Sequence, residues 1–236
     1  IRQAALTVKT LGKFTKSSPF TWEPVCYPGY TLITPTFPND TDNLDSYFTI
    51  IKIKGELSEE LGVSKYVEAP SSALHMTVAR LISGNSFREN LEGVRENEFI
   101  EAVKALSKCN KVNGGLKFEI KGVTVFPSGV VAALISTSYE DDYNSLQSFR
   151  DIIYNDTTLG RFGVERKRRF SGHITLFYVE DDLENEEKEK LIDAVTETNS
   201  KYFKKPVPFT IKRAELRRFN NFMEFHWDES MPFLEL

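Results

Sequence analysis

The chain has few of the residues that usually form cross-links or bind metals. Only two cysteines, Cys26 and Cys109, occur among its 236 residues, and they stand far apart in no C-x-x-C pattern. This spacing predicts neither a disulfide framework nor a zinc site, so we expect two buried free thiols. The acidic residues near the motifs described below likewise form no ligand-spaced cluster. The sequence therefore predicts no bound metal and no cofactor.

Long apolar runs and an excess of positive charge are also missing. No apolar stretch reaches the length that spans a bilayer, and the first residues show no positive-then-apolar signal pattern. We therefore expect a cytoplasmic protein that does not contact a membrane. The net charge of -4 argues against a protein that coats duplex DNA, whereas a small or terminal phosphate substrate is compatible with it.

The chain is nevertheless long and apolar enough to form a full core. With 236 residues and 40% apolar content, it can fold as one compact domain without external cross-links. Residues 1–29 combine three prolines with scattered aromatic residues, which predicts an irregular arm lying on the body. Residues 30–236 are expected to form a single domain of two similar lobes, and we expect a monomer.

Hydrophobic periodicity predicts strands and helices that alternate along residues 30–236. The expected strands lie at residues 31–34, 73–79, 116–125, 130–137, 171–177, 209–216 and 222–227. The expected helices lie at residues 44–61, 99–106, 146–153 and 191–202. The alternation shifts phase near Lys121-Gly122, which predicts a β-bulge inside the strand at 116–125.

The second half of the chain repeats the first half in the same order. Residues 118–125 align with 209–216, including the phase shift, and each segment follows a helix that follows an H-x-T sequence. Two copies of one unit that pair about a pseudo-dyad place equivalent residues face to face. We therefore expect His75 and His173, one in each copy, to share one cleft.

Two of the three histidines are followed by a threonine two residues later. Residues i and i+2 of a strand point to the same face, so His75 projects with Thr77, and His173 with Thr175. Imidazoles exchange protons near neutral pH, and hydroxyls can bind phosphoryl oxygens. In-line cleavage of a phosphodiester needs a base and an acid on opposite sides of phosphorus, which two histidines can supply. His226 lacks such a threonine, and we expect it to be structural.

Basic and aromatic residues near the two motifs are further candidates for substrate binding. The run 166–169 is either a solvated loop or a positive rim that draws a phosphate towards His173, with Arg169 as the candidate ligand. A nucleobase could stack on aromatic rings beside the motifs. The candidates for this role are Tyr30, Phe126, Phe170 and Tyr178.

The paired motifs resemble those of the two-histidine (2H) phosphoesterase superfamily, in its cyclic-phosphodiesterase-like branch. The resemblance extends over residues 30–228 through the order of the elements. It implies an α+β class and a bilobal duplicated fold, in which two antiparallel sheets face a central cleft and the helices lie outside. It also implies metal-independent catalysis by His75 and His173, with Thr77 and Thr175 binding phosphate.

Members of that superfamily open 2',3'-cyclic nucleotides, process RNA ends or act on ADP-ribose cyclic phosphates. The resemblance therefore implies a phosphoric diester hydrolase whose substrate is a nucleotide or an RNA-terminal phosphate. An RNA end-processing nuclease or ligase-like enzyme with the same site is one alternative, which a long basic groove would favour over a closed aromatic pocket. A catalytically idle nucleotide-binding module is the other alternative, and the two intact motifs argue against it.

Overall fold

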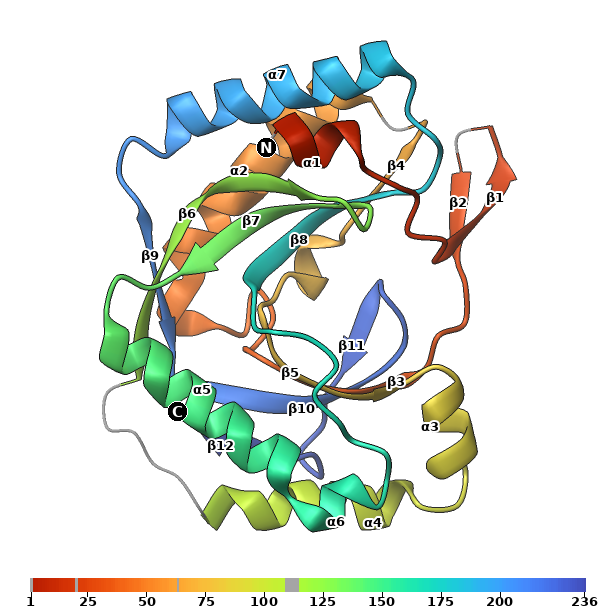
Figure 1. Cartoon of the computed structure of the whole chain (residues 1–236), viewed down its shortest axis with the longest axis vertical. Helices are drawn as coiled ribbons and strands as arrows, with labels where there is room; N and C mark the ends of the chain where they lie inside the picture. Colours follow the sequence, from red (N-terminus) through yellow and green to blue (C-terminus); the bar gives the residue numbers. More distant parts are fainter. Residues whose placement is uncertain (1, 20, 63, 109–114) are drawn as a thin grey trace.

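The computed structural model describes residues 2–19, 21–62, 64–108 and 115–236. Within these residues the strands form two five-stranded sheets and one two-stranded sheet, and every strand pair is antiparallel. Figure 1 shows the two larger sheets with helices along their outer sides. None of the described helices has the length and apolar character of a membrane span.

The first large sheet has the strand order β11-β10-β3-β5, and β12 also pairs with β10. Helices α3 and α4 lie against this sheet at the end of the molecule opposite α7 (Asn185–Tyr202), as Figure 1 shows. The bounds are Gly29–Ile33 for β3, Thr77–Ser83 for β5, Asn85–Asn90 for α3, Glu96–Ala105 for α4, Arg213–Asn221 for β10, Glu224–His226 for β11 and Phe233–Glu235 for β12.

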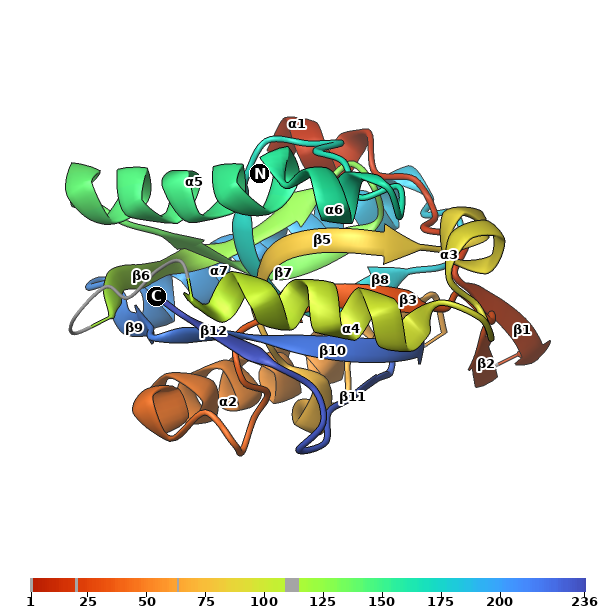
Figure 2. The same cartoon turned by 90° about the horizontal axis from the view of Figure 1, so that it is seen from below.

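The second large sheet has the strand order β4-β8-β7-β6-β9. Helices α1 (Arg2–Leu6), α2 and α7 contact its strands, while α5 contacts β6 of this sheet and β5 of the first sheet. The bounds are Leu44–Leu61 for α2, Tyr66–Glu68 for β4, Leu116–Phe126 for β6, Val130–Ser136 for β7, Glu140–Asn155 for α5, Thr157–Gly160 for α6, Gly172–Val179 for β8, Asn185–Tyr202 for α7 and Val207–Ile211 for β9. Figure 2 shows α2 and α5 on opposite sides of the strands.

The strand pairing confirms the internal repeat and shows that the two halves exchange a strand. β6 belongs to the first half of the sequence but pairs with β7, and β10 belongs to the second half but pairs with β3. Leu32 of β3 pairs with Leu216, and Val131 of β7 pairs with Val125. Val125 and Leu216 therefore occupy equivalent positions in the two sheets, as the sequence alignment places them. Each sheet is built by both halves, so neither lobe can form from one half alone.

The expected single strand at 209–216 is wrong, because the chain changes sheet within it. Phe209 lies in β9 of the second sheet and Leu216 lies in β10 of the first, with exposed Lys212 between the strands. In the first copy the same phase shift is a bulge inside β6, between Ile120 and Gly122, as predicted. The same phase shift thus marks a bulge inside one strand in the first copy, and the passage of the chain from one sheet to the other in the second copy. The last strand, β12, was not expected, and β11 is shorter than the predicted 222–227.

The first residues of the chain are more ordered than the predicted irregular arm. They contain the short helix α1 (Arg2–Leu6) and the strands β1 (Phe14–Ser18) and β2 (Thr21–Pro24), which pair with each other. Cys26 follows β2 at the surface and is exposed, so its predicted burial is wrong because the arm rather than the core holds it. Cys109 lies outside the described residues.

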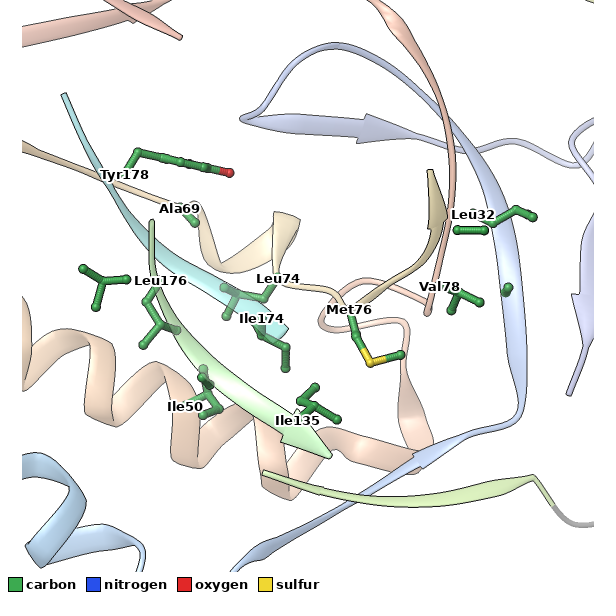
Figure 3. Close-up of a cluster of buried hydrophobic side chains, with 14 of the residues drawn as sticks. Leu32, Ile50, Ala69, Leu74, Met76, Val78, Ile135, Ile174, Leu176 and Tyr178 are labelled. Atoms are coloured by element: carbon green, nitrogen blue, oxygen red, sulfur yellow. The ribbon is translucent and has the colours of Figure 1, made fainter. Parts of the chain in front are cut away.

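Apolar side chains from both motif segments meet in one buried cluster. Figure 3 shows Leu74 and Met76 from the first segment beside Ile174 from the second, with Ile135 of β7 and Ile50 of α2 closing the cluster. These side chains are almost completely buried. The burial of such apolar surface is the main stabilising contribution to folding, so it fixes the two segments against each other.

Candidate active site

The two motif segments meet at an isolated antiparallel bridge between Met76 and Ile174. These residues follow the two histidines directly and occupy equivalent positions of the repeat. The pseudo-dyad therefore passes between them. Both side chains point into the cluster of Figure 3, as expected for directly opposed residues of an antiparallel pair.

The polar residues on either side of this bridge point away from the core. Successive side chains in extended backbone alternate between faces, so the four neighbours of the bridge share the opposite face. His75 stands opposite Thr175, and Thr77 stands opposite His173. All four side chains are half-buried, in contrast to the fully buried residues between them. The structure thus brings together the two histidines and two threonines that the sequence singled out.

His75 lies just before β5 and not inside a strand, so the predicted strand at 73–79 begins too early. A 3-10 helix, η2 (Ser71–Ala73), occupies the start of that segment. Sheet-like pairing begins at Met76, whose N–H donates to Thr34 Oγ1 at 3.0 Å and whose carbonyl accepts from the Thr34 N–H at 2.9 Å. His173 by contrast lies within β8.

The two imidazoles are oriented by the same local device. The Nδ1 of His75 lies 2.6 Å from the carbonyl oxygen of Ala73, and the Nδ1 of His173 lies 2.8 Å from that of Ser171. A carbonyl oxygen can only accept, so Nδ1 carries the proton in each neutral ring. The Nε2 of each neutral ring is then unprotonated and available as a proton acceptor.

Burial and nearby positive charge favour the neutral form of His75. Burial is the largest cause that lowers its pKa to about 4, the Ala73 hydrogen bond opposes this, and the charges of His173 and Arg217 lower it further. The ring of Phe225 packs edge-on against His75, with centroids 4.3 Å apart. His75 is therefore neutral at pH 7 in the absence of a bound anion.

His173 has a similar environment with different partners. Burial lowers its pKa, the hydrogen bond to Ser171 raises it, and the positive charge of Arg80 lowers it. The ring of Phe126 lies 5.0 Å from the His173 ring, centroid to centroid. Because the charge of His173 contributes to the low pKa of His75, the two rings are within electrostatic reach of each other.

The hydroxyls of Thr77 and Thr175 have no hydrogen-bond partner in the part of the chain that the structure describes. Neighbouring threonines differ, since the Thr31 hydroxyl donates to the carbonyl oxygen of Ala79 and the Thr34 hydroxyl accepts from Met76. The hydroxyls of Thr77 and Thr175 are therefore free to bind a ligand.

Of the predicted aromatic candidates, Phe126 and Tyr178 lie on the strands beside the motifs. Phe126 is half-buried next to His173. Tyr178 is buried, its ring stacks on Phe222 at 6.0 Å between centroids, and its hydroxyl donates to the Phe222 carbonyl at 3.3 Å. The face of Tyr178 is thus already covered by the chain itself.

Tyr30 is wrong as a candidate for stacking a substrate. Its side chain is buried on the helix-covered face of β3 and packs against Phe87 and Phe99, with centroids 5.9 and 5.3 Å away. Its hydroxyl donates to Glu96, which also pairs with Arg218. The alternation of β3 explains this placement, because Tyr30 and Thr31 must point to opposite faces.

The remaining candidates lie outside the group of four motif side chains. Arg169 is exposed in the loop before β8, and no contact joins it to either histidine among the described residues. Phe170 is half-buried and packs against Phe118, with ring centroids 6.4 Å apart. His226 is exposed and lies 3.2 Å from Glu224, so it takes no part in the paired arrangement.

Three residues beside the histidines were not found from the sequence, namely Arg80, Arg217 and Phe225. Arg217 and Phe225 come from β10 and β11, far from both motifs along the chain. They reach His75 only because β10 pairs with β3. One sequence signal could have found Arg217. The alignment of residues 118–125 with 209–216, extended by one residue, aligns Arg217 with Phe126.

Two cavities of the structure lie away from the motif residues. One cavity of about 300 Å³ is lined by residues that include Asp40, Lys212 and Arg213, and another of about 410 Å³ lies beside α5. In the described part of the chain, no group of three or more His, Cys, Asp or Glu side chains could hold a metal ion.

No protein-family model matches the chain, and no curated protein is similar to it in sequence. A conserved protein of unknown function from Agrobacterium tumefaciens matches its structure with a TM-score of 0.65 and 18% identity, covering 89% of each chain. The two chains share one fold. Further structural neighbours are a phosphoesterase and Escherichia coli LigT bound to 3'-AMP, each with a TM-score of 0.49, 12% identity, and coverage of 89% of this chain and 95% of theirs. The predicted α+β class with two antiparallel sheets is confirmed.

Proposed function

We propose that the chain is a metal-independent phosphodiesterase that hydrolyses a cyclic 2',3'-type or RNA-terminal phosphodiester. His75 and His173 are its general acid and base. The observation that supports this most strongly is the Met76–Ile174 bridge, which turns two histidines and two threonines to one face of the molecule. A pair of imidazoles related by a pseudo-dyad approaches a phosphorus atom from two sides, as in-line displacement requires.

The tautomers of the two rings fit this chemistry. Each Nδ1 is held by a backbone carbonyl, so each Nε2 is the atom that exchanges protons with substrate. Both rings are neutral in the free protein, and the negative charge of a bound phosphodiester favours protonation of one of them. The neutral ring takes a proton from the attacking water, and the protonated ring gives a proton to the departing oxygen.

The threonines complete the proposed site. Thr77 and Thr175 stand opposite the histidine of the other segment, and their unused hydroxyls donate to the two non-bridging phosphoryl oxygens. Such bonds orient the phosphorus between the two imidazoles. The half-buried ring of Phe126 beside His173 is the aromatic surface that the proposal assigns to the nucleoside part of the substrate.

The net charge of the chain supports a substrate class. We propose that the protein acts as a cytoplasmic monomer on a nucleotide or an RNA-terminal phosphate. The net charge of -4 supports a small or terminal phosphate over duplex DNA. Exposed Arg169 contributes to the positive rim that attracts the phosphate.

A turnover screen tests the proposal. The protein is incubated with 2',3'-cyclic nucleotides, ADP-ribose cyclic phosphate and 3'-tailed RNA in the presence of EDTA, and the products are separated and quantified. We expect turnover of at least one cyclic or terminal phosphodiester, and its loss in His75→Ala and His173→Ala. Tight binding of nucleotides without turnover of any substrate would contradict the proposal and indicate an idle binding module.

A further inference from the structure

The two lobes differ in the residues that flank the paired histidines. Strand pairing defines a row across each sheet at the position five residues after each histidine. The row of the first sheet holds Arg217, Thr31 and Arg80, and the row of the second sheet holds Phe126, Val130 and Tyr178. Two rows at the same distance from their histidines thus carry arginines in one lobe and aromatic rings in the other.

Arg217 therefore occupies the position that Phe126 occupies in the other lobe. The ring of Phe126 lies beside His173. The charge of Arg217 acts on His75. The symmetry of the two lobes is broken at this position, because it holds a buried arginine in one lobe and a phenylalanine ring in the other.

The guanidinium of Arg217 is buried and held from two sides. Arg217 is 5% exposed, its Nε donates to Glu215 Oε2 at 3.0 Å, and its Nη2 donates to the same oxygen. Its Nη1 donates to the carbonyl oxygen of Phe225 at 3.2 Å, and the Phe225 ring packs against His75. Arg217 thus fixes both a positive charge and an aromatic ring next to this histidine.

The other charged groups near the histidines do not remove this asymmetry. His75 is faced by His173 from β8 and by Arg217 from β10, and His173 is faced by Arg80 from β5. Arg80 is exposed, so water and salt screen its charge, whereas the buried charge of Arg217 is screened less. Glu215 partly balances Arg217, but it also pairs with Arg213 at 2.8 Å.

We propose that Arg217 is a positioning residue that disfavours protonation of His75, so that His75 is the general base and His173 the general acid. This inference rests on the proposed function. His75 Nε2 takes the proton of the attacking water as the new O–P bond forms. His173 gives its proton to the ribose oxygen as the old P–O bond breaks. Solvent then removes the proton from His75 and restores the one on His173.

The pH profile of kcat/KM tests the role of Arg217. In the free enzyme the acidic limb reports the base and the alkaline limb reports the acid. We expect Arg217→Met to move the acidic limb upward by at most about one pH unit, so that activity falls up to about fivefold near pH 4, about twofold near pH 5 and little at pH 7. Arg217→Lys retains the positive charge, so its acidic limb should lie close to the pH at which the wild-type limb lies. The matched control is Arg218→Met, which removes a paired arginine from the opposite face of the same strand.

The shape of the pH profile of Arg217→Met separates a positioning role of Arg217 from a merely structural one. A loosened site lowers kcat/KM by the same factor at every pH, and that result would overturn the inference. Movement of the alkaline limb alone would overturn it too, because it would place Arg217 beside the general acid. Glu215 keeps its Arg213 partner in Arg217→Met, so the variant leaves no buried carboxylate without a cation.

A second measurement needs no variant of Arg217. In a nucleoside 3'-(4-nitrophenyl phosphate), the leaving group departs without a proton, so the general acid becomes dispensable. We expect His173→Ala to approach wild-type turnover on this ester while His75→Ala stays at least about a hundredfold slower. The reverse pattern would exchange the two roles. If the wild type turned over neither this ester nor any substrate of the turnover screen, the proposed function itself would be wrong.

Discussion

Replacing each motif threonine by valine tests whether a phosphate binds to the face that His75, Thr77, His173 and Thr175 share, here called the shared face. Thr77 and Thr175 are half-buried, and their hydroxyls have no partner within the described residues of the protein. Valine keeps the β-branched shape that extended backbone favours and removes only the hydroxyl. The folded protein therefore loses no internal hydrogen bond, and we expect little change in melting temperature.

The expected loss follows from the bond that the hydroxyl makes with substrate. A hydrogen bond to a charged oxygen contributes about 1.5 to 3 kcal/mol, so each substitution should lower kcat/KM about ten- to a hundredfold. The double variant should lose less than the product of the two factors, because both hydroxyls hold the same phosphoryl group.

Two assays separate binding from folding in these variants. The first is kcat/KM on a 2',3'-cyclic nucleotide, and the second is the inhibition constant of inorganic phosphate and of a nucleoside monophosphate. Thr210→Val, which changes a half-buried strand threonine in β9, is the matched control. Equal inhibition constants in Thr77→Val, Thr175→Val and the parent would refute the reasoning, since the hydroxyls would then not face the bound anion.

Three further outcomes are expected. EDTA should leave turnover unchanged, and loss of activity that one added divalent metal restores would contradict a metal-independent site. Tyr30→Phe should lower the free energy of unfolding by about 1.5 to 3 kcal/mol, because it removes the hydrogen bond to Glu96, and should leave kcat/KM unchanged; a raised KM would return Tyr30 to the substrate site. Folding lowers the pKa of His75 from 6.5 to about 4, so the unfolded chain binds the extra proton and stability falls as pH drops through this window. The melting temperature of the wild type should therefore fall more steeply between pH 6.5 and 4 than that of His75→Gln, and parallel curves would contradict the burial of this ring.

The sequence predicts that the two histidines and two threonines share one face, because two independent patterns lead to the same placement. Alternation separates His75 and Thr77 from Met76, and the repeat relates this segment to the one around His173. Both patterns are local or require only one alignment, so they can be read without knowing which strands pair. The bridge between Met76 and Ile174 is what the two patterns together imply.

The sequence does not predict features that depend on the exchange of strands between the halves. Arg217 reaches His75 only through the pairing of β10 with β3, and no local pattern marks that pairing. Tyr30 stands close to a motif strand, but its face of the sheet is covered by helices, which sequence proximity does not show. The segment 209–216 keeps one alternating pattern while its two ends lie in different sheets.

The most direct test of the central claim is a double-variant cycle on the two histidines. Turnover of a 2',3'-cyclic nucleotide is measured for the wild type, His75→Ala, His173→Ala and the double variant, each with its fold verified by circular dichroism. Each single change should lower turnover at least about a hundredfold, and the double change should add little to the larger single loss, because each histidine acts only when the other is in place. Wild-type turnover in either folded single variant would contradict the paired mechanism.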